Sequence, residues 1–541
     1  MTVFILGAGV MQIPAIRAAK ELGWTVVAAD ADSGAPGVGE ADRFVHVDLK
    51  DLDGLVGAAR GISSAIGLDG VFTAGTDFST SVAWVAQELG LPGIPFETAL
   101  KASDKLRMRA ALEAAGVPSP RYVAAGRADD PSAVAAGLGF PLVVKPADSM
   151  GARGCRAARD PSELAEALSA ALPYSRSGMA IIEEFVEGPE FSIDALVEGD
   201  EIRIRGVADR HIAFLPCFVE LGHSMPSAYP PEVVDEVLRV FRLGVKAIGI
   251  DIGAAKGDMK FCPSRGGAVV GEIAARLSGG YMSGWTYPYA SGIDPAREAL
   301  RLSVGMGLGA GREDRGWASA ERAFISIPGR IASIEGRDEA ERTPYVKQLF
   351  LRVSVGDRVV FPTNNVEKCG NVISQAPSRE EAVRAAVSAA GAMRLRLAAG
   401  EPETESFLGS NGSHADGWPP PAFVVEGEAA RELATMPEYL DCAAPGEGPI
   451  APFALAGSVM GGDWSGRGFA ESADLALSLR QIRREGERGR SESPPNIPAR
   501  RRTLAGRFWR ALARGGLQAA LYVLDTEDAA PGIGRNGGSG R

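Results

Sequence analysis

The chain lacks the features that mark secreted, membrane-spanning and nucleic-acid-binding proteins. Its five cysteines are dispersed and form no CxxC pair, which argues against a disulfide framework or a cysteine metal site. Its net charge of −11 argues against binding nucleic acid, because neutralising phosphates requires a basic surface. No run reaches the roughly 18 apolar residues of a membrane span, and the first 20 residues lack the basic start of a signal peptide. We therefore expect a cytoplasmic protein.

What is present is the composition of an ordinary globular enzyme with several domains. Apolar residues make up 45% and charged residues 23% of the chain, as in typical soluble proteins. A length of 541 residues exceeds one hydrophobic core and predicts about three or four domains. Glycine (68) and proline (35) are abundant, and much of that excess lies in the last third, where the pattern of regular structure is poor.

The first hundred residues alternate short apolar strands with helical spacing. Strands are predicted over 2–6, 25–29 and 69–73, and helices over 13–22 and 81–89. This alternation predicts a parallel sheet covered by helices, an α/β domain over residues 1–98. Gly7 and Gly9 follow the first strand as in a dinucleotide-binding turn, but Gln12 stands where that fingerprint has its third glycine. NAD binding is therefore the last of the alternatives.

The pattern then becomes mixed, as in α+β domains. Strands are predicted over 142–145, 181–185, 191–197, 202–207, 268–273, 323–327, 348–353 and 370–374. Ser103 is the predicted N-cap of a helix that runs to Ala115, and a second helix is expected over 379–397. These elements predict one α+β domain over residues 99–310 and a smaller one over 318–400.

Four motifs, in a fixed order along the chain, consist of residue types that bind a nucleoside triphosphate. Lys105 stands at the start of a helix and Lys145 at the end of a strand, and each could reach a phosphate. The loop after Lys145 contains Ser149, Gly151 and Gly154, and its small residues leave backbone N–H groups free to surround phosphate oxygens. These two motifs predict the phosphate half of a nucleotide site.

The third motif predicts the nucleoside half. Glu183, Glu184, Phe185 and Val186 form an expected edge strand, whose backbone donors and acceptors can bond adenine. Glu190 follows closely and can hold ribose hydroxyls.

The fourth motif pairs two carboxylates with an arginine. Asp258 and Glu272 are expected on neighbouring strands, where Mg²⁺ or Mn²⁺ would bridge the phosphates of ATP, and Arg276 would offset charge in the transition state. Each motif alone has an ordinary structural explanation, such as a solvated lysine or a plain turn. The ordered combination favours a Mg-ATP site.

In this order the motifs resemble those of the ATP-grasp superfamily, over about residues 1–400. SDKLRMRAALEAAGVPSPRY resembles the family's leading helix, and KPADSMGARG resembles its phosphate loop. IIEEFVEGPEFSIDAL resembles its adenine-hinge strands, and GEIAARLSGG resembles its metal-binding strand. The resemblance implies a Rossmann-like domain (1–98), an ATP-grasp domain (99–310) and a small α+β C-terminal domain (318–400), and it leaves an extension (405–541) of unknown role. It implies phosphate contacts for Lys105 and Lys145, adenine contacts for Glu183 and Val186, ribose binding by Glu190, metal binding by Asp258 and Glu272, and contact with the transferred phosphate for Arg276.

Two further segments, ERAFISIPGRIASIEG and GNVISQAPSREEAVRAA, resemble the C-terminal domain of amino-acid ligases in this superfamily. The resemblance implies a carboxylate–amine ligase that forms an acyl phosphate and then an amide or peptide bond, acting on small-molecule substrates. Many family members carry Asn two residues after the second metal carboxylate, and Ala274 stands there, which leaves the number of metal ions open. The alternatives are a bicarbonate-activating enzyme and a catalytically decayed ATP-binding protein. Dimers are common in such folds, so a homodimer is open.

Substrate contacts are expected in two places. The segment 218–227 resembles a substrate-side strand and loop, in which Glu220 would orient an amine and His223 would be a polar contact. Ser278 and Gly279 would let backbone N–H groups approach the acyl phosphate.

Residues 405–541 lie outside the resemblance. Residues 480–514 hold 11 Arg against three Glu, and residues 500–524 can be drawn as a basic amphipathic helix interrupted by two glycines. Its expected apolar face consists of Leu504, Phe508, Trp509 and Leu512. We expect this helix to dock on the protein's own body or to form a flexible tail; contact with an anionic membrane or an acidic partner is the alternative.

Overall fold

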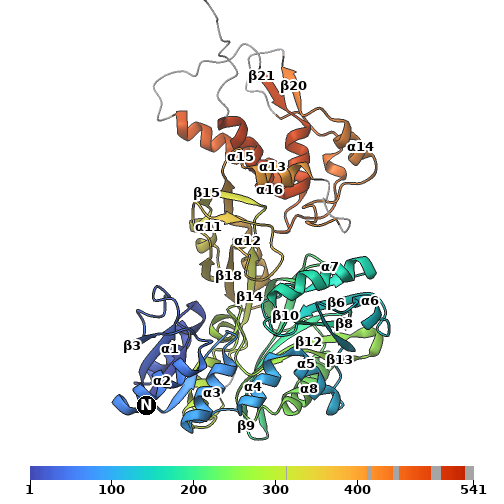
Figure 1. Cartoon of the computed structure of the whole chain (residues 1–541). Helices are drawn as coiled ribbons and strands as arrows, with labels where there is room; N and C mark the ends of the chain where they lie inside the picture. The colour runs from blue at the N-terminus through green and yellow to red at the C-terminus, as the bar shows by residue number, and fades with distance from the viewer. Residues whose placement is uncertain (312–313, 411–416, 443–449, 489–500, 530–541) are drawn as a thin grey trace, which may run out of the picture. The chain divides into compact units, whose positions relative to one another are not determined.

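The computed structural model describes residues 1–311, 314–410, 417–442, 450–488 and 501–529. It divides the chain into two compact units (Figure 1). The first comprises residues 1–322, 363–366 and 373–386, and the second comprises residues 323–362, 367–372 and the described part of 387–541. Among the described residues, no helix is both long enough and apolar enough to cross a membrane.

The first unit begins with a parallel sheet in the order β3-β2-β1-β4. Its strands are β1 (Thr2–Leu6), β2 (Thr25–Asp30), β3 (Arg43–His46) and β4 (Gly70–Phe72), and its helices are α1 (Ile13–Glu21), α2 (Leu52–Ile66) and α3 (Ser79–Leu89). β1 is buried along its whole length because apolar side chains pack on both faces of the sheet. The expected parallel α/β fold of this region is confirmed. β3 is not among the predicted strands, because its polar edge residues are partly exposed.

A small antiparallel sheet follows, in the order β5-β8-β6-β7. It consists of β5 (Tyr122–Gly126), β6 (Leu142–Pro146), β7 (Arg156–Ala158) and β8 (Met179–Glu184). α7 (Pro161–Ala171) packs its buried leucines and alanines against this sheet (Figure 1). The phosphate loop, defined here as residues 149–154, connects β6 to β7.

A larger antiparallel sheet runs in the order β13-β12-β9-β10-β11 and continues to β14. Its strands are β9 (Glu190–Glu198), β10 (Glu201–Ala213), β11 (Val219–Met225), β12 (Ile252–Cys262), β13 (Gly267–Ala274) and β14 (Ala318–Phe324). α8 (Pro231–Ile248) lays a buried apolar face against β12 and β13, together with α5 (Lys105–Ala114). The remaining helices of this region are α4 (Phe96–Ser103), α6 (Pro131–Val134), α9 (Tyr287–Ser291) and α10 (Pro295–Ser303).

The second unit is built on β15 (Gly329–Glu335), which lies between β17 (Arg358–Val359) and β19 (Arg394–Leu397). It also contains α11 (Arg337–Arg342), β16 (Val346–Leu351), α13 (Pro402–Gly409), α14 (Gly427–Thr435), α15 (Phe469–Arg488) and α16 (Gly506–Ala529), and β20 (Tyr439–Cys442) pairs with β21 (Arg501–Leu504). β18 (Gly370–Ala376) and α12 (Arg379–Ala392) have residues in both units. α16 is buried along most of its length and packs against α15, so the expected docking of this helix is what the structure shows.

Three predicted helix boundaries are wrong, and the strand expected over 323–327 runs instead over 318–324 as β14. The N-cap of α5 is Asp104 rather than Ser103, because the Asp104 carboxylate accepts bonds from two backbone N–H groups of the first turn. The helix expected over 379–397 ends at Ala392, and the alternating sequence RLRL that follows forms β19. The helix expected over 500–524 starts only at Gly506, because residues 501–504 pair with β20; residue 500 lies outside the described residues.

Candidate functional site

Glu183 lies on β8 and is buried between two cations. Arg109 Nε is 2.7 Å from Glu183 Oε1, and Lys145 Nζ is 2.6 Å from Glu183 Oε2. Burial alone would raise the pKa of Glu183, but the charges of Arg109 and Lys145 outweigh it and hold the pKa at about 2. Arg109 also donates to the carbonyl of Gly271 at 2.7 Å, which ties α5 to β13. The carboxylate of Glu183 is therefore committed to these partners, and its expected place beside adenine stays a prediction.

The edge strand expected over 183–186 is wrong, because β8 lies between β5 and β6 and ends at Glu184, and Phe185 and Val186 follow it. Glu184 accepts bonds from two arginines, each at 3.0 Å. The ring of Phe185 lies 6.2 Å from that of Phe218, and Lys260 Nζ lies 5.3 Å from the centre of the Phe185 ring. Lys260 also donates to the carbonyl of Val186 at 3.0 Å. Aromatic surface and backbone polar groups therefore occur together here, as a purine base requires.

The phosphate loop is held by residues from several elements. Lys105 Nζ donates to the carbonyl of Ser149 at 2.5 Å. Lys105 and the phosphate loop, which are both predicted to bind phosphate, therefore lie together. Arg153 lies 3.5 Å from Asp77, which follows β4. Gly154 has a φ of +67°, and a Cβ at this position would come within 2.7 Å of the Tyr174 ring, so glycine is required here.

Asp258 and Glu272 face each other as partners in register on β12 and β13, as the sequence predicts for a metal-binding pair. Asp258 forms ion pairs with Lys256 and, at 3.3 Å, with Arg210. Burial would raise the pKa of Glu272, but four cations hold it at about 2; they are Lys105, Lys256, Arg276 and Lys145. A carboxylate pair within this group of cations fits a metal ion bound together with a polyphosphate.

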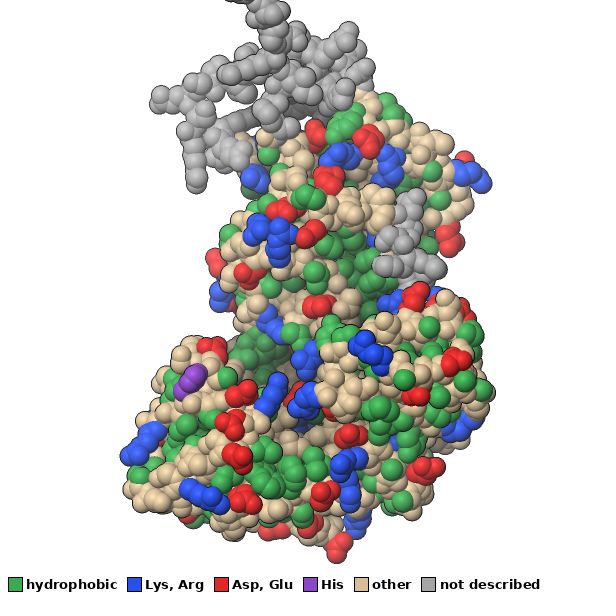
Figure 2. Space-filling view, in the orientation of Figure 1, with side chains coloured by type: hydrophobic (Ala, Val, Ile, Leu, Met, Phe, Trp, Pro, Cys, Tyr) green, Lys and Arg blue, Asp and Glu red, His purple; other side chains and the backbone are tan. Residues whose placement is uncertain are grey.

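Asp258 and Glu272 are not joined by a third His, Cys, Asp or Glu in the part of the chain that the structure describes. Within the described ranges, no group of three or more His, Cys, Asp or Glu side chains could hold a metal ion. Ala274, two residues after Glu272, offers no side-chain oxygen to a metal ion. Figure 2 shows Lys and Arg side chains gathered around a hollow in the face of the first unit.

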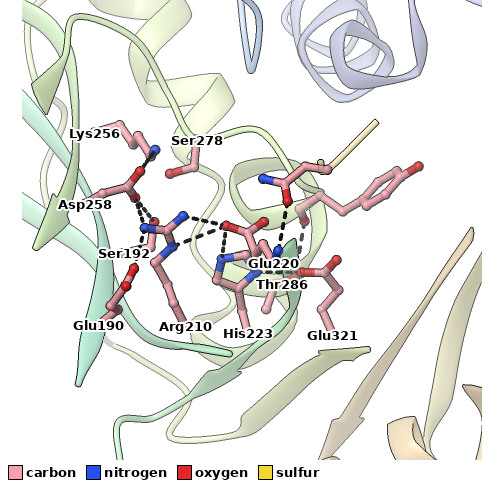
Figure 3. Close-up of polar contacts among 12 residues, drawn as sticks. Glu190, Ser192, Arg210, Glu220, His223, Lys256, Asp258, Ser278, Thr286 and Glu321 are labelled. Atoms are coloured by element: carbon pink, nitrogen blue, oxygen red, sulfur yellow. Dashed lines mark hydrogen bonds and ion pairs between the residues drawn. The ribbon is translucent and has the colours of Figure 1, made fainter. Parts of the chain in front are cut away.

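Five charged side chains form a row across the larger sheet. Lys260, Glu190, Arg210, His223 and Glu321 are successive register partners on β12, β9, β10, β11 and β14. Glu190 lies 2.9 Å from Lys260 and 3.2 Å from Arg210, and His223 Nδ1 lies 2.6 Å from Glu321 Oε2. We call these residues the charge row, and Figure 3 shows all of them but Lys260. The carboxylate of Glu190 is thus paired, and its expected contact with ribose stays a prediction.

Glu220 connects the two halves of the charge row. Its Oε2 lies 2.8 Å from Arg210 Nη2 and 3.4 Å from His223 Nε2 (Figure 3). Burial would lower the pKa of His223, but Glu220 and Glu321 outweigh it and raise the pKa to about 9, so the imidazole is protonated. The structure therefore brings together Glu220 and His223, the two residues expected on the amine side. Arg210 and Glu321 were missed, because their significance depends on pairing between strands distant in the sequence.

Arg276 and the loop after it complete the site. The side chain of Arg276 is buried, and within the described part of the chain its Nε has no hydrogen-bond partner, so a donor remains for an anion. The backbone N–H and the hydroxyl of Ser278 both donate to Asp194 Oδ1, at 2.9 and 2.7 Å. The N–H of Ser278 is therefore bonded to Asp194, and its expected contact with an acyl phosphate stays a prediction. Gly279 packs closely against Gly75, where a Cβ on Gly279 would lie 3.0 Å from the Gly75 carbonyl oxygen.

The N-terminal glycine turn is filled from within. Gly7 has a φ of +107°, and a Cβ there would lie 2.9 Å from the amide carbon of Gln12. The Gln12 side chain is buried and donates to the carbonyl of Ala74 at 2.7 Å. The Gln12 side chain therefore fills the space beside Gly7, at the position where the dinucleotide-binding fingerprint has its third glycine for close helix–strand packing.

Three family models match this chain. An ATP-grasp N-terminal domain matches residues 16–93, an ATP-grasp domain matches residues 102–279, and L-amino acid ligase C-terminal domain 2 matches residues 323–398. The region of the candidate site from Lys105 to Ser278 lies within the second match.

Curated relatives match over different shares of their length. "Uncharacterized protein y4rH" of Sinorhizobium fredii is 29% identical over 347 residues, which cover 63% of this chain and 71% of that protein. The carbamoyl phosphate synthase large chain of Thermus thermophilus is 26% identical over 328 residues, which cover 57% of this chain but only 30% of that protein.

Solved structures share the fold of this chain. The L-amino acid ligase from Bacillus licheniformis has a TM-score of 0.63 at 21% identity, covering 73% of this chain and 98% of its own. Phosphoribosylglycinamide synthetase from Anaerococcus prevotii has a TM-score of 0.58 at 19% identity, covering 73% and 99%.

Proposed function

The chain belongs to the ATP-grasp superfamily, and we propose that it is a carboxylate–amine ligase acting on small-molecule substrates. ATP transfers its γ-phosphoryl group to a carboxylate, which gives an acyl phosphate and ADP. An amine then attacks the acyl carbon and displaces inorganic phosphate, which leaves an amide or peptide bond. The L-amino acid ligase C-terminal domain match favours this reaction over activation of bicarbonate.

The observation that carries this proposal is the group of four cations around Glu272, opposite Asp258. Phosphoryl transfer needs little covalent chemistry from a protein, because positioning and neutralisation of charge supply most of the rate. Lys105, Lys145 and the phosphate loop would hold the phosphates, and the unpartnered Nε of Arg276 would face the transferred group. When bound by Asp258 and Glu272, Mg²⁺ or Mn²⁺ would neutralise phosphate charge.

The substrate pair can be identified by a phosphate-release screen over amino acids, with mass spectrometry of the products. We expect phosphate release that requires both an amine and a carboxylate. The mass of the product should equal the summed masses of the two substrates minus one water. Phosphate release that needs only bicarbonate would instead support the bicarbonate-activating alternative. Tight ATP binding without turnover across the panel would support a decayed site.

The variant Glu272→Gln tests the metal assignment. Removing one of two carboxylate ligands should lower kcat/KM by at least about 100-fold, or about 2.7 kcal/mol in the transition state. Glu232→Gln is the matched control, because Glu232 is exposed in the first turn of α8. Amide formation at the control rate by Glu272→Gln would refute the assignment.

A further inference from the structure

The short segment 363–366 belongs to the first unit, whereas the residues directly before and after it belong to the second. Within this segment, Asn364 Oδ1 accepts a bond from the backbone N–H of Val366 at 2.9 Å, and Asn364 is buried. This local bond fixes the backbone on both sides of Asn365. The segment is therefore a shaped turn that presents Asn365 to the candidate site.

Asn365 bonds two parts of that site at once. Its backbone N–H donates to the carbonyl of Gly151, in the phosphate loop, at 3.1 Å. Its side-chain Oδ1 accepts a bond from the backbone N–H of Glu220, on β11, at 2.8 Å. A single residue thus connects the loop expected over the phosphates with the strand expected beside the amine.

The contact to Glu220 extends further into the site. The carboxylate of Glu220 lies 2.8 Å from Arg210, and Arg210 lies 3.3 Å from Asp258. The backbone of Glu220 is therefore tied to the phosphate loop, and its side chain is tied to the expected metal carboxylate. A movement of the phosphate loop would therefore displace Asn365 and, through its hydrogen bond, the backbone of Glu220.

We propose that Asn365 is a positioning residue that holds the phosphate loop and Glu220 in register, so that phosphoryl transfer stays coupled to attack by the amine. This inference rests on the proposed ligase function. If the amine is misplaced, water can attack the acyl phosphate instead, which returns the free carboxylate and phosphate. ATP is then spent without an amide, and the ratio of ADP released to amide formed rises above one.

Three variants test the role of Asn365. Asn365→Ala removes the side-chain acceptor but keeps the backbone donor, and Asn365→Asp keeps an acceptor oxygen at the same position. Gln87→Ala is the control, because Gln87 Oε1 likewise accepts a bond from a backbone N–H, that of Phe96, at an exposed position. For Asn365→Ala we expect the KM for the amine to rise about tenfold, because one hydrogen bond is lost. We also expect the ratio of ADP released to amide formed to rise. The Kd for a non-hydrolysable ATP analogue with Mg²⁺ should change less than about twofold.

Two kinetic results would overturn the inference. One is an ADP-to-amide ratio in Asn365→Ala equal to that of the wild type. The other is a loss of analogue affinity as large as the rise in KM, which would make Asn365 only a nucleotide-binding residue. Asn365→Asp should restore most of the coupling, and failure to do so would also count against it.

Hydrogen–deuterium exchange tests the same coupling without turnover, so it separates this inference from the proposed function. In Asn365→Ala with the ATP analogue, we expect faster exchange both at the Glu220 amide and in residues 149–154. Asn365→Asp and Gln87→Ala should match the wild type. Faster exchange at Glu220 alone, with an unchanged phosphate loop, would show that the two are not connected through Asn365.

Discussion

Arg109 shows how single residues hold the site together. Its side chain is 1% exposed, and replacing it with leucine would leave Glu183 buried with Lys145 as its remaining partner. Breaking a buried ion pair by removing one partner costs about 3–5 kcal/mol. We expect Arg109→Leu to lower the free energy of unfolding by this amount in urea titrations.

The matched control is Arg107→Leu on the same helix. Arg107 is 53% exposed and lies 3.5 Å from Glu97, and exposed pairs contribute at most about 1 kcal/mol. Equal losses in the two variants would contradict the assigned importance of the buried pair.

His223 makes stability depend on pH. Its pKa is raised from 6.5 to about 9 in the folded protein, because the carboxylates of Glu220 and Glu321 outweigh the effect of burial. The contribution is therefore complete below the unfolded pKa and is lost as the pH rises through the folded pKa. We expect the free energy of unfolding to fall by up to about 3 kcal/mol between pH 6.5 and pH 9. The variant His223→Gln should lack this part of the slope, whereas His46→Gln, at an exposed histidine, should keep it.

The sequence indicated the site residues that stand in local motifs, but it did not indicate the charged residues that pair with them. Lys105, Asp258 and Glu272 stand in local motifs whose residue types already suggest their chemistry, and the structure places them together. Arg210 and Glu321 carry no such motif. Their roles follow from strand register, which places side chains from β9, β10, β11 and β14 in one row, and no local pattern encodes that register.

At the scale of elements, composition alone did not decide which strands were predicted, since the apolar β5 was missed and part of the mixed β10 was found. β1 and β2 are buried and were found, but β12, with Lys256 and Asp258 among its glycines and alanines, was expected only as the strand that carries Asp258, and its bounds were not predicted. Its pairing with β9 and β13 stabilises it where its composition does not. The end of α12 was misplaced for a related reason, since the change from helical to alternating spacing spans only four residues.

The interruption of α16 at two glycines is confirmed and can be tested. Gly516 has φ +62° and ψ −155°, a region of backbone conformation open essentially to glycine alone. We expect Gly516→Ala to lower the free energy of unfolding by about 1–3 kcal/mol, measured by urea titration. Gly409→Ala is the control, because Gly409 lies in α13 with open space around it and no positive φ. A harmless Gly516→Ala substitution would refute the strained conformation.

At the scale of the whole molecule, the C-terminal extension is part of the second unit rather than a separate tail, as far as it is described. The residues of the expected apolar face are buried, although Leu504 lies on β21 and not on α16. Trp509 of α16 stacks near Phe469 of α15 with ring centres 5.8 Å apart. Gln518 accepts a bond from the backbone N–H of Ile327 at 2.9 Å, which ties α16 to the segment after β14.

This packing predicts the outcome of a membrane-binding test. Because the apolar residues of α16 are already buried within the protein, they are not available to enter a lipid surface. We expect the full-length protein to remain in the supernatant when it is centrifuged with anionic vesicles at low salt. Pelleting that a variant lacking residues 480–541 does not show would support the membrane alternative instead.

Dissolved salt should have little effect on the buried ion pairs of the charge row. Mobile ions screen charges that face water over about 8 Å at physiological ionic strength, but they hardly reach pairs inside a protein. Added salt should therefore weaken surface pairs such as Arg17–Glu40 and leave the attraction between His223 and Glu321 nearly unchanged. The interaction energies of the buried ion pairs in the site would therefore be nearly the same at low and at high salt concentration.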